Sequence, residues 1–148
     1  MRWVVLILVL AGFSAACGDA TTPTSPSSST PATVTERFDD IINIGGSAFS
    51  TFAVNQNGGS TSLNLASLSP INRPGVLNVT MEIGWGKVIK DDDGNNIGCS
   101  LQRVMQVTPS LQSQLSDALA PGVDYCANIA DVGGLREPAN FSIRIAHP

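Results

Sequence analysis

The sequence predicts an all-β protein, an antiparallel and jelly-roll-like β-sandwich of about seven strands with one possible short helix. The first supporting observation is the alternation of apolar and polar residues from Leu77 to Trp85, which is typical of a strand with one buried side. The second is a series of short apolar segments separated by turns rich in Gly and Asn. The third is composition, because charged residues make up only 14% and Gly, Ser, Thr and Asn are plentiful.

The first 16 residues have the layout of an export signal. Arg2 precedes an apolar run over residues 3–10, and small residues follow it. The run is shorter than the roughly 20 residues that span a bilayer, so a membrane-spanning helix is disfavoured. We predict a signal peptide over residues 1–16.

The cleavage site allows two interpretations. Ala15-Ala16-Cys17 is similar to the lipobox of bacterial lipoproteins, in which the cysteine is lipidated and becomes the new N-terminus. Ser14 stands where Leu is usual, and the small residues at 14 and 16 also suit ordinary signal-peptidase cleavage. We predict lipidation at Cys17, with a soluble periplasmic or extracellular protein as the alternative.

We predict a spacer over residues 17–35 and a single folded domain over residues 36–148. The tract from 21 to 31 consists of Thr, Ser and Pro and has no apolar side chain to bury, so nothing offsets the entropy cost of ordering it. Such a tract would hold the domain away from a membrane.

The domain contains seven predicted strands, at residues 38–44, 49–54, 63–70, 77–85, 97–107, 125–130 and 141–145. Trp85 falls in phase with its apolar neighbours and is predicted to lie in the core. Gly84 and Gly86 fall on the opposite side, which indicates a bulge, loose packing or a close approach by another group. Residues 109–119 are either a helix, because three leucines are spaced by four and Pro109 suits a first turn, or an irregular crossover.

Three cysteines are consistent with one lipid anchor and one disulfide. If Cys17 carries lipid, Cys99 and Cys126 remain to pair, and an exported protein retains such a bond. Cross-linking residues 126 − 99 = 27 apart would stabilise the fold by roughly 3–4 kcal/mol in the chain-entropy model. Two cysteines and the distant His147 do not make a tetrahedral zinc site.

Charge excludes some partners. The formal net charge is −4, and loss of Arg2 with the signal gives −4 − 1 = −5. No basic stripe is present to neutralise phosphates, so we predict no nucleic-acid partner. Attachment to anionic lipid by charge is disfavoured for the same reason.

Three segments resemble the bacterial pre-peptidase C-terminal domain: Gly45-Gly46-Ser47-Ala48-Phe49, residues 120–126 (APGVDYC) and residues 138–145 (PANFSIRI). The resemblance covers roughly residues 36–148. It implies a jelly-roll-like sandwich that serves as a secreted, non-catalytic accessory module, often attached to a peptidase. It also implies that polymeric substrates or calcium are possible ligands, without assigning ligand residues.

One turn is a weak candidate for calcium. Asp91, Asp93 and Asn95 offer oxygen ligands, but the segment does not match an EF-hand loop, so a solvated hairpin turn is the preferred interpretation. A second acidic group at residues 36, 39 and 40 either joins a cation site or marks a polar strand face. No cofactor is predicted.

No catalytic residues are predicted. The single histidine, His147, is expected to be exposed near the end of the chain, and no serine lies in a Gly-x-Ser-x-Gly motif. The sequence therefore predicts an exported, lipid-anchored, non-catalytic binding module of the bacterial cell envelope. Its predicted partners are the membrane, through the lipid anchor, and an extracellular protein or polysaccharide. The alternatives are a secreted hydrolase with a carboxylate pair and a purely structural envelope lipoprotein.

Overall fold

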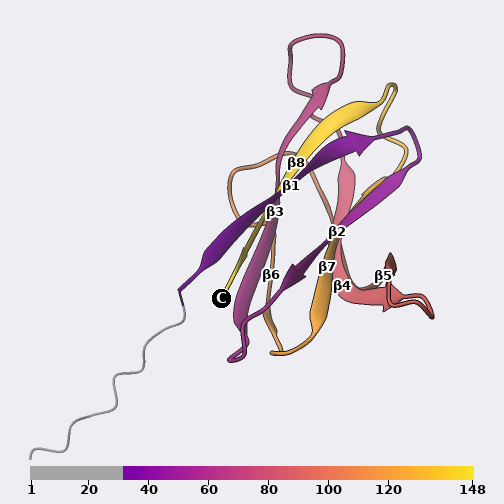
Figure 1. Ribbon diagram of the computed structural model, residues 1–148. Helices are drawn as coiled ribbons and strands as arrows, with labels where there is room; N and C mark the ends of the chain where they lie inside the picture. The colour runs from indigo at the N-terminus through magenta and orange to yellow at the C-terminus, as the bar shows by residue number, and fades with distance from the viewer. Residues whose placement is uncertain (1–31) are drawn as a thin grey trace, which may run out of the picture.

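The computed structural model describes residues 32–148 and shows two four-stranded antiparallel sheets packed face to face (Figure 1). The first sheet has the order β1-β8-β3-β6 and the second the order β2-β7-β4-β5. The strands are β1 (Val34–Ile42), β2 (Ser47–Ala53), β3 (Gly59–Pro70), β4 (Met81–Lys90), β5 (Asn96–Val107), β6 (Leu115–Leu119), β7 (Asp124–Asp131) and β8 (Ala139–His147). The predicted all-β antiparallel sandwich is confirmed.

The sandwich has eight strands instead of about seven, and residues 32–148 contain no helix. The additional strand is β6, which occupies the end of the segment considered as a helix. Leu115 and Leu119 are buried, whereas Leu111 is 74% exposed. A spacing of four residues returns to the same side of a strand as well as of a helix, so leucine spacing alone did not distinguish them.

The core lies between the inward-facing residues of the two sheets. On β4, Met81, Ile83 and Trp85 are buried, as the alternation predicted, although the strand begins at residue 81 instead of 77. The partly buried residues 77 and 79 pack against the core ahead of the strand. Trp85 meets Tyr125 edge to face, with ring centroids 5.9 Å apart, which confirms its place in the core.

The strand β5 folds across the outer face of its neighbour β4. In the sheet order β4 lies between β5 and β7, so the Cα atoms of β5 and β7 should be about 9–10 Å apart. Yet Cys99 on β5 and Cys126 on β7 form a disulfide with a Cα–Cα distance of 5.8 Å. The predicted disulfide is therefore present, and it reaches across β4.

Gly86 makes this crossing possible. A Cβ atom at Gly86 would lie 2.0 Å from the carbonyl oxygen of Ser100, and one at Gly84 would lie 2.6 Å from that of Arg103. The β4–β5 register shifts between residues 85 and 86, which is a bulge in the pairing. The backbone of β5 thus covers Gly84 and Gly86 on the outer face of β4.

Asp131, at the end of β7, links the turns at one end of the sandwich. Its carboxylate accepts hydrogen bonds from the backbone N–H groups of Gly45, Gly133, Gly134 and Leu135, at 2.8–3.1 Å. Desolvation is the largest single influence on the pKa of Asp131 and raises it, but the four N–H donors together outweigh it and hold the pKa below its usual range.

Candidate functional site

A pocket of about 340 Å³ lies at the end of the sandwich where β1 begins and β2 ends. Strands of both sheets supply its walls because antiparallel pairing brings the starts of β1, β5 and β7 to the same end as the end of β2. The lining residues are Glu36, Thr51, Phe52, Ala53, Asn96 and Asp124. The pocket therefore combines two carboxylates, a hydroxyl and an amide with an apolar floor.

A buried histidine, His147, is within hydrogen-bond distance of the Glu36 carboxylate. The Nε2 atom of His147 lies 2.9 Å from Oε1 of Glu36, and its Nδ1 atom lies 3.2 Å from the carbonyl oxygen of Pro148. The imidazole packs on Phe52 at a centroid distance of 5.5 Å. His147 is only 3% exposed, so the expectation of an exposed histidine was wrong. The inward-facing series 141, 143 and 145 continues to residue 147, and this signal would have placed the ring inside.

Asp124, on the other wall, pairs with Lys90 at the end of β4. The Nζ–Oδ2 distance is 2.6 Å, and about half of each side chain is exposed. An ion pair this exposed contributes little stability, because water and salt screen it. It does connect the β4–β5 hairpin to the start of β7.

Two further carboxylates, on the β4–β5 turn and on β6, have a lowered pKa. Asp91 and Asp117 join Asp131 in having a lowered pKa; the Asp91 pKa is lowered mainly by hydrogen bonds from Asn95, and the Asp117 pKa mainly by a hydrogen bond from Arg103. The arrangement in the pocket suits hydrogen bonding to a polar group.

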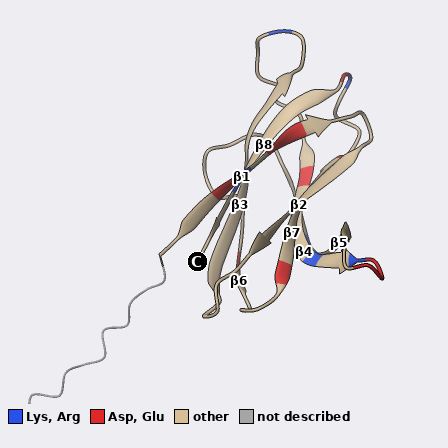
Figure 2. Cartoon of the chain, viewed as in Figure 1, with Lys and Arg blue, Asp and Glu red and all other residues tan. Residues whose placement is uncertain are grey.

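The acidic turn at the tip of the β4–β5 hairpin stands out in Figure 2. The carboxylate of Asp91 accepts hydrogen bonds from the backbone N–H groups of Asp93 and Asn95 and from the Asn95 amide, at 2.7–3.1 Å. These bonds form a self-capped turn in which both carboxylate oxygens of Asp91 are engaged. Between residues 32 and 148, no three His, Cys, Asp or Glu side chains gather as a potential metal site.

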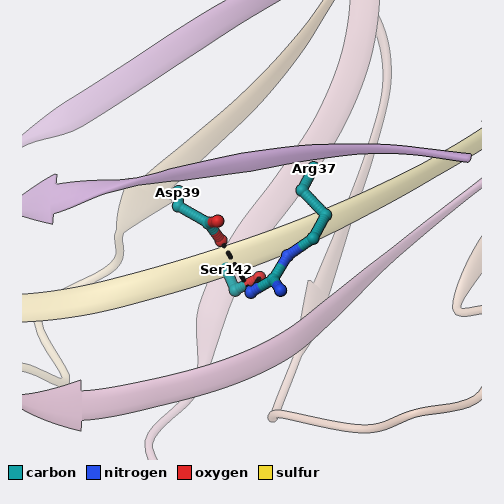
Figure 3. A network of polar contacts seen from close by, with 3 residues as sticks. All are labelled: Arg37, Asp39 and Ser142. Carbon is teal, nitrogen blue, oxygen red and sulfur yellow. Dashed lines mark hydrogen bonds and ion pairs between the residues drawn. The ribbon is translucent and has the colours of Figure 1, made fainter.

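The second acidic group, on β1, does not converge on one site. Figure 3 shows Asp39 on the outer face, where Arg37 donates to it and to Ser142 of β8, both at 3.2 Å. Asp40 accepts from the backbone N–H of Ile41 at 2.7 Å, while Glu36 faces His147. The three carboxylates thus have three different partners.

The opposite end of the sandwich exposes aliphatic side chains on three loops, residues 43–46, 71–80 and 132–138, which we call the distal loops. These side chains belong to Ile44, Ile71, Val76 and Val132, of which Val76 is 78% exposed. Three contacts connect these loops or anchor them to the end of β7: Arg73 pairs with Glu137, the N–H of Gly45 donates to the Asp131 carboxylate, and the N–H of Asp131 donates to the carbonyl oxygen of Gly46. At the pocket end the turns 54–58 and 120–123 expose no large aliphatic side chain, whereas Val34, Ile89 and Ile97 are exposed at the start of β1 and in the β4–β5 hairpin.

Several predicted features lie outside the described residues. These are the signal peptide at residues 1–16, the lipidation site Cys17 and most of the spacer; β1 already begins at Val34, inside the predicted spacer. Within residues 32–148, no helix is long and apolar enough to cross a membrane.

No protein-family model matches the sequence, and no curated protein matches it. The resemblance to the pre-peptidase C-terminal domain therefore stays a prediction from short segments.

Proposed function

We propose that this protein is an exported, lipid-anchored and non-catalytic binding module of the bacterial cell envelope. Cys17 would carry the lipid, residues 18–33 would act as the spacer, and the sandwich would make contact with an extracellular protein or polysaccharide.

The observation that carries the proposal is the placement of the distal loops relative to the chain entry. Residue 34 enters the sandwich at the pocket end, where it pairs with His147. The exposed Ile44, Ile71, Val76 and Val132 lie at the other end. The spacer is therefore attached at the end opposite these side chains and leaves them accessible. Aliphatic groups exposed on connected loops are a common feature of contact surfaces.

The anchor is tested by labelling cells with an alkyne analogue of palmitate. The wild-type protein should be labelled and should sediment with membranes, whereas Cys17→Ser should be neither labelled nor membrane-bound. Equal labelling of both would remove the anchor from the proposal.

The contact surface is tested by placing a photo-crosslinking residue at position 76, in the distal loops, or at position 57, in an exposed turn at the pocket end. Irradiation of intact cells should give a discrete adduct from position 76 and none from position 57. Ile44→Asp should weaken the adduct. Adducts of equal yield from both positions, or none from either, would contradict a binding role for the distal loops.

The pocket supports a second candidate, a hydrolase with a carboxylate pair, because Glu36 and Asp124 line one cavity with a histidine behind Glu36. We expect no turnover of a panel of nitrophenyl glycosides. Turnover that is lost in Glu36→Gln and retained in the outer-face variant Asp39→Asn would replace the binding proposal with a catalytic one.

A further inference from the structure

The strand β5 depends less on the core than its length suggests. Of its twelve residues, Val107 alone belongs to the buried hydrophobic core. Residues 101–106 are all exposed, including Leu101 and Met105. Because lifting the strand would expose little apolar surface, the hydrophobic effect holds it only weakly.

The first half of β5 and the end of β4 form an arm, residues 88–101, with few attachments to the rest of the sandwich. The pairing of β4 with β7 ends at Lys87, so residues beyond it pair only within the hairpin. Outside the hairpin the arm is held by the exposed Lys90–Asp124 ion pair and by the Cys99–Cys126 disulfide. The disulfide is the stronger of the two, because a surface ion pair contributes little.

We propose that the Cys99–Cys126 disulfide is a redox latch: a dithiol reductant releases the arm, whose pairing near Gly86 then opens, while the rest of the two sheets stays folded. Closed, the arm places Ser100 over Gly86 and supplies Asn96 to the pocket. In the open state the arm uncovers the outer face of β4 at Gly86, and Asn96 no longer lines the pocket. The oxidation state of one bond thus determines whether the pocket is complete.

The exchange reaction has a defined direction. Cys99 is partly exposed whereas Cys126 is fully buried, so a thiolate of the dithiol attacks Sγ of Cys99 and Cys126 leaves as a thiolate. The second thiol of the dithiol then attacks the mixed disulfide and releases Cys99. The dithiol becomes a disulfide, its two electrons pass to the cysteines, and its two protons end on their sulfurs.

The test is hydrogen exchange followed by mass spectrometry on the full mature chain carrying Cys17→Ser, which leaves two cysteines. Dithiothreitol is the probe, and alkylation after quenching counts the free thiols. With two thiols free, amides in residues 88–101 should exchange at least about tenfold faster, while those in β3 and β8 change less than about twofold. Reoxidation should restore slow exchange.

Three results would overturn the proposal. The first is a bond that dithiothreitol does not reduce under native conditions, and the second is reduction without faster exchange in residues 88–101. The third is equal acceleration throughout the domain, which would mean global unfolding. The Cys99→Ser/Cys126→Ser variant is the matched control: it should show the open pattern without reductant and should not respond to it. If that variant does not fold, the reversible change in the parent chain still decides the question.

Discussion

The crossing of β5 over β4 can be tested with the substitution Gly86→Ala. A Cβ at this position would lie 2.0 Å from the Ser100 carbonyl oxygen and 2.5 Å from its carbonyl carbon, whereas ordinary contacts begin near 3.4 Å. The backbone of β5 would have to retreat by roughly 3.4 − 2.0 = 1.4 Å. The disulfide one residue away, at Cys99, opposes that movement.

The expected cost of Gly86→Ala is about 2–4 kcal/mol of unfolding free energy, at or above the usual range for overpacking because the obstacle is backbone. Gly98→Ala is the matched control, since its Cβ would meet only the Ile89 side chain at 3.5 Å. That control should change stability by less than about 1 kcal/mol.

Urea unfolding followed by tryptophan fluorescence measures both variants in a chain of residues 17–148, because Trp85 is the single tryptophan of those residues and precedes the substituted residue. In the Cys99→Ser/Cys126→Ser background the cost of Gly86→Ala should fall by half or more, because the arm is free to lift. A loss below about 1 kcal/mol in the disulfide-bonded protein, with an unchanged m-value, would refute the crossing.

Three further predictions follow from single sites. Asp131→Asn should cost about 1–2 kcal/mol near neutral pH. Since the folded pKa of Asp131 is lowered, this stabilisation is present above the unfolded pKa of about 3.9 and is lost as pH falls through the folded value, so the difference between wild type and variant in urea titrations should vanish in acid. Thr61→Val should stabilise by about 1 kcal/mol in thermal melts, because the buried Thr61 hydroxyl has no hydrogen-bond partner within residues 32–148; a loss of stability would contradict that assignment. Calcium should leave the melting temperature unchanged, and a rise that is lost in Asp91→Asn plus Asp93→Asn would instead assign a cation site to the acidic turn.

The inward faces of three strands were predictable from sequence. Alternation alone identified the inward faces of β4, β7 and β8, because each side chain on those strands has a clear inside or outside. The same rule could not identify β6, because a leucine spacing of four fits the period of a helix as well as that of a strand. It also gave no warning that β5, exposed on both faces, would fold over its neighbour.

The candidate site was largely unpredictable because it depends on sheet order. Glu36, Asn96 and Asp124 are far apart in the sequence and meet only because β1, β5 and β7 begin at the same end of the sandwich. Alternation specifies which way a side chain faces, but not which strand lies beside it. Counting cysteines predicted the disulfide, but the count could not show that the bond reaches across β4.

The position of β8 affects when the protein can fold. This last strand of the sandwich lies between β1 and β3, so the earliest strand gains its hydrogen-bonded neighbour only when the final residues have emerged. The register that pairs Val34 with His147 closes a loop almost as long as the domain, and contacts this distant in sequence form slowly. A chain threaded through a membrane in an extended state would therefore stay unfolded until its last strand had crossed.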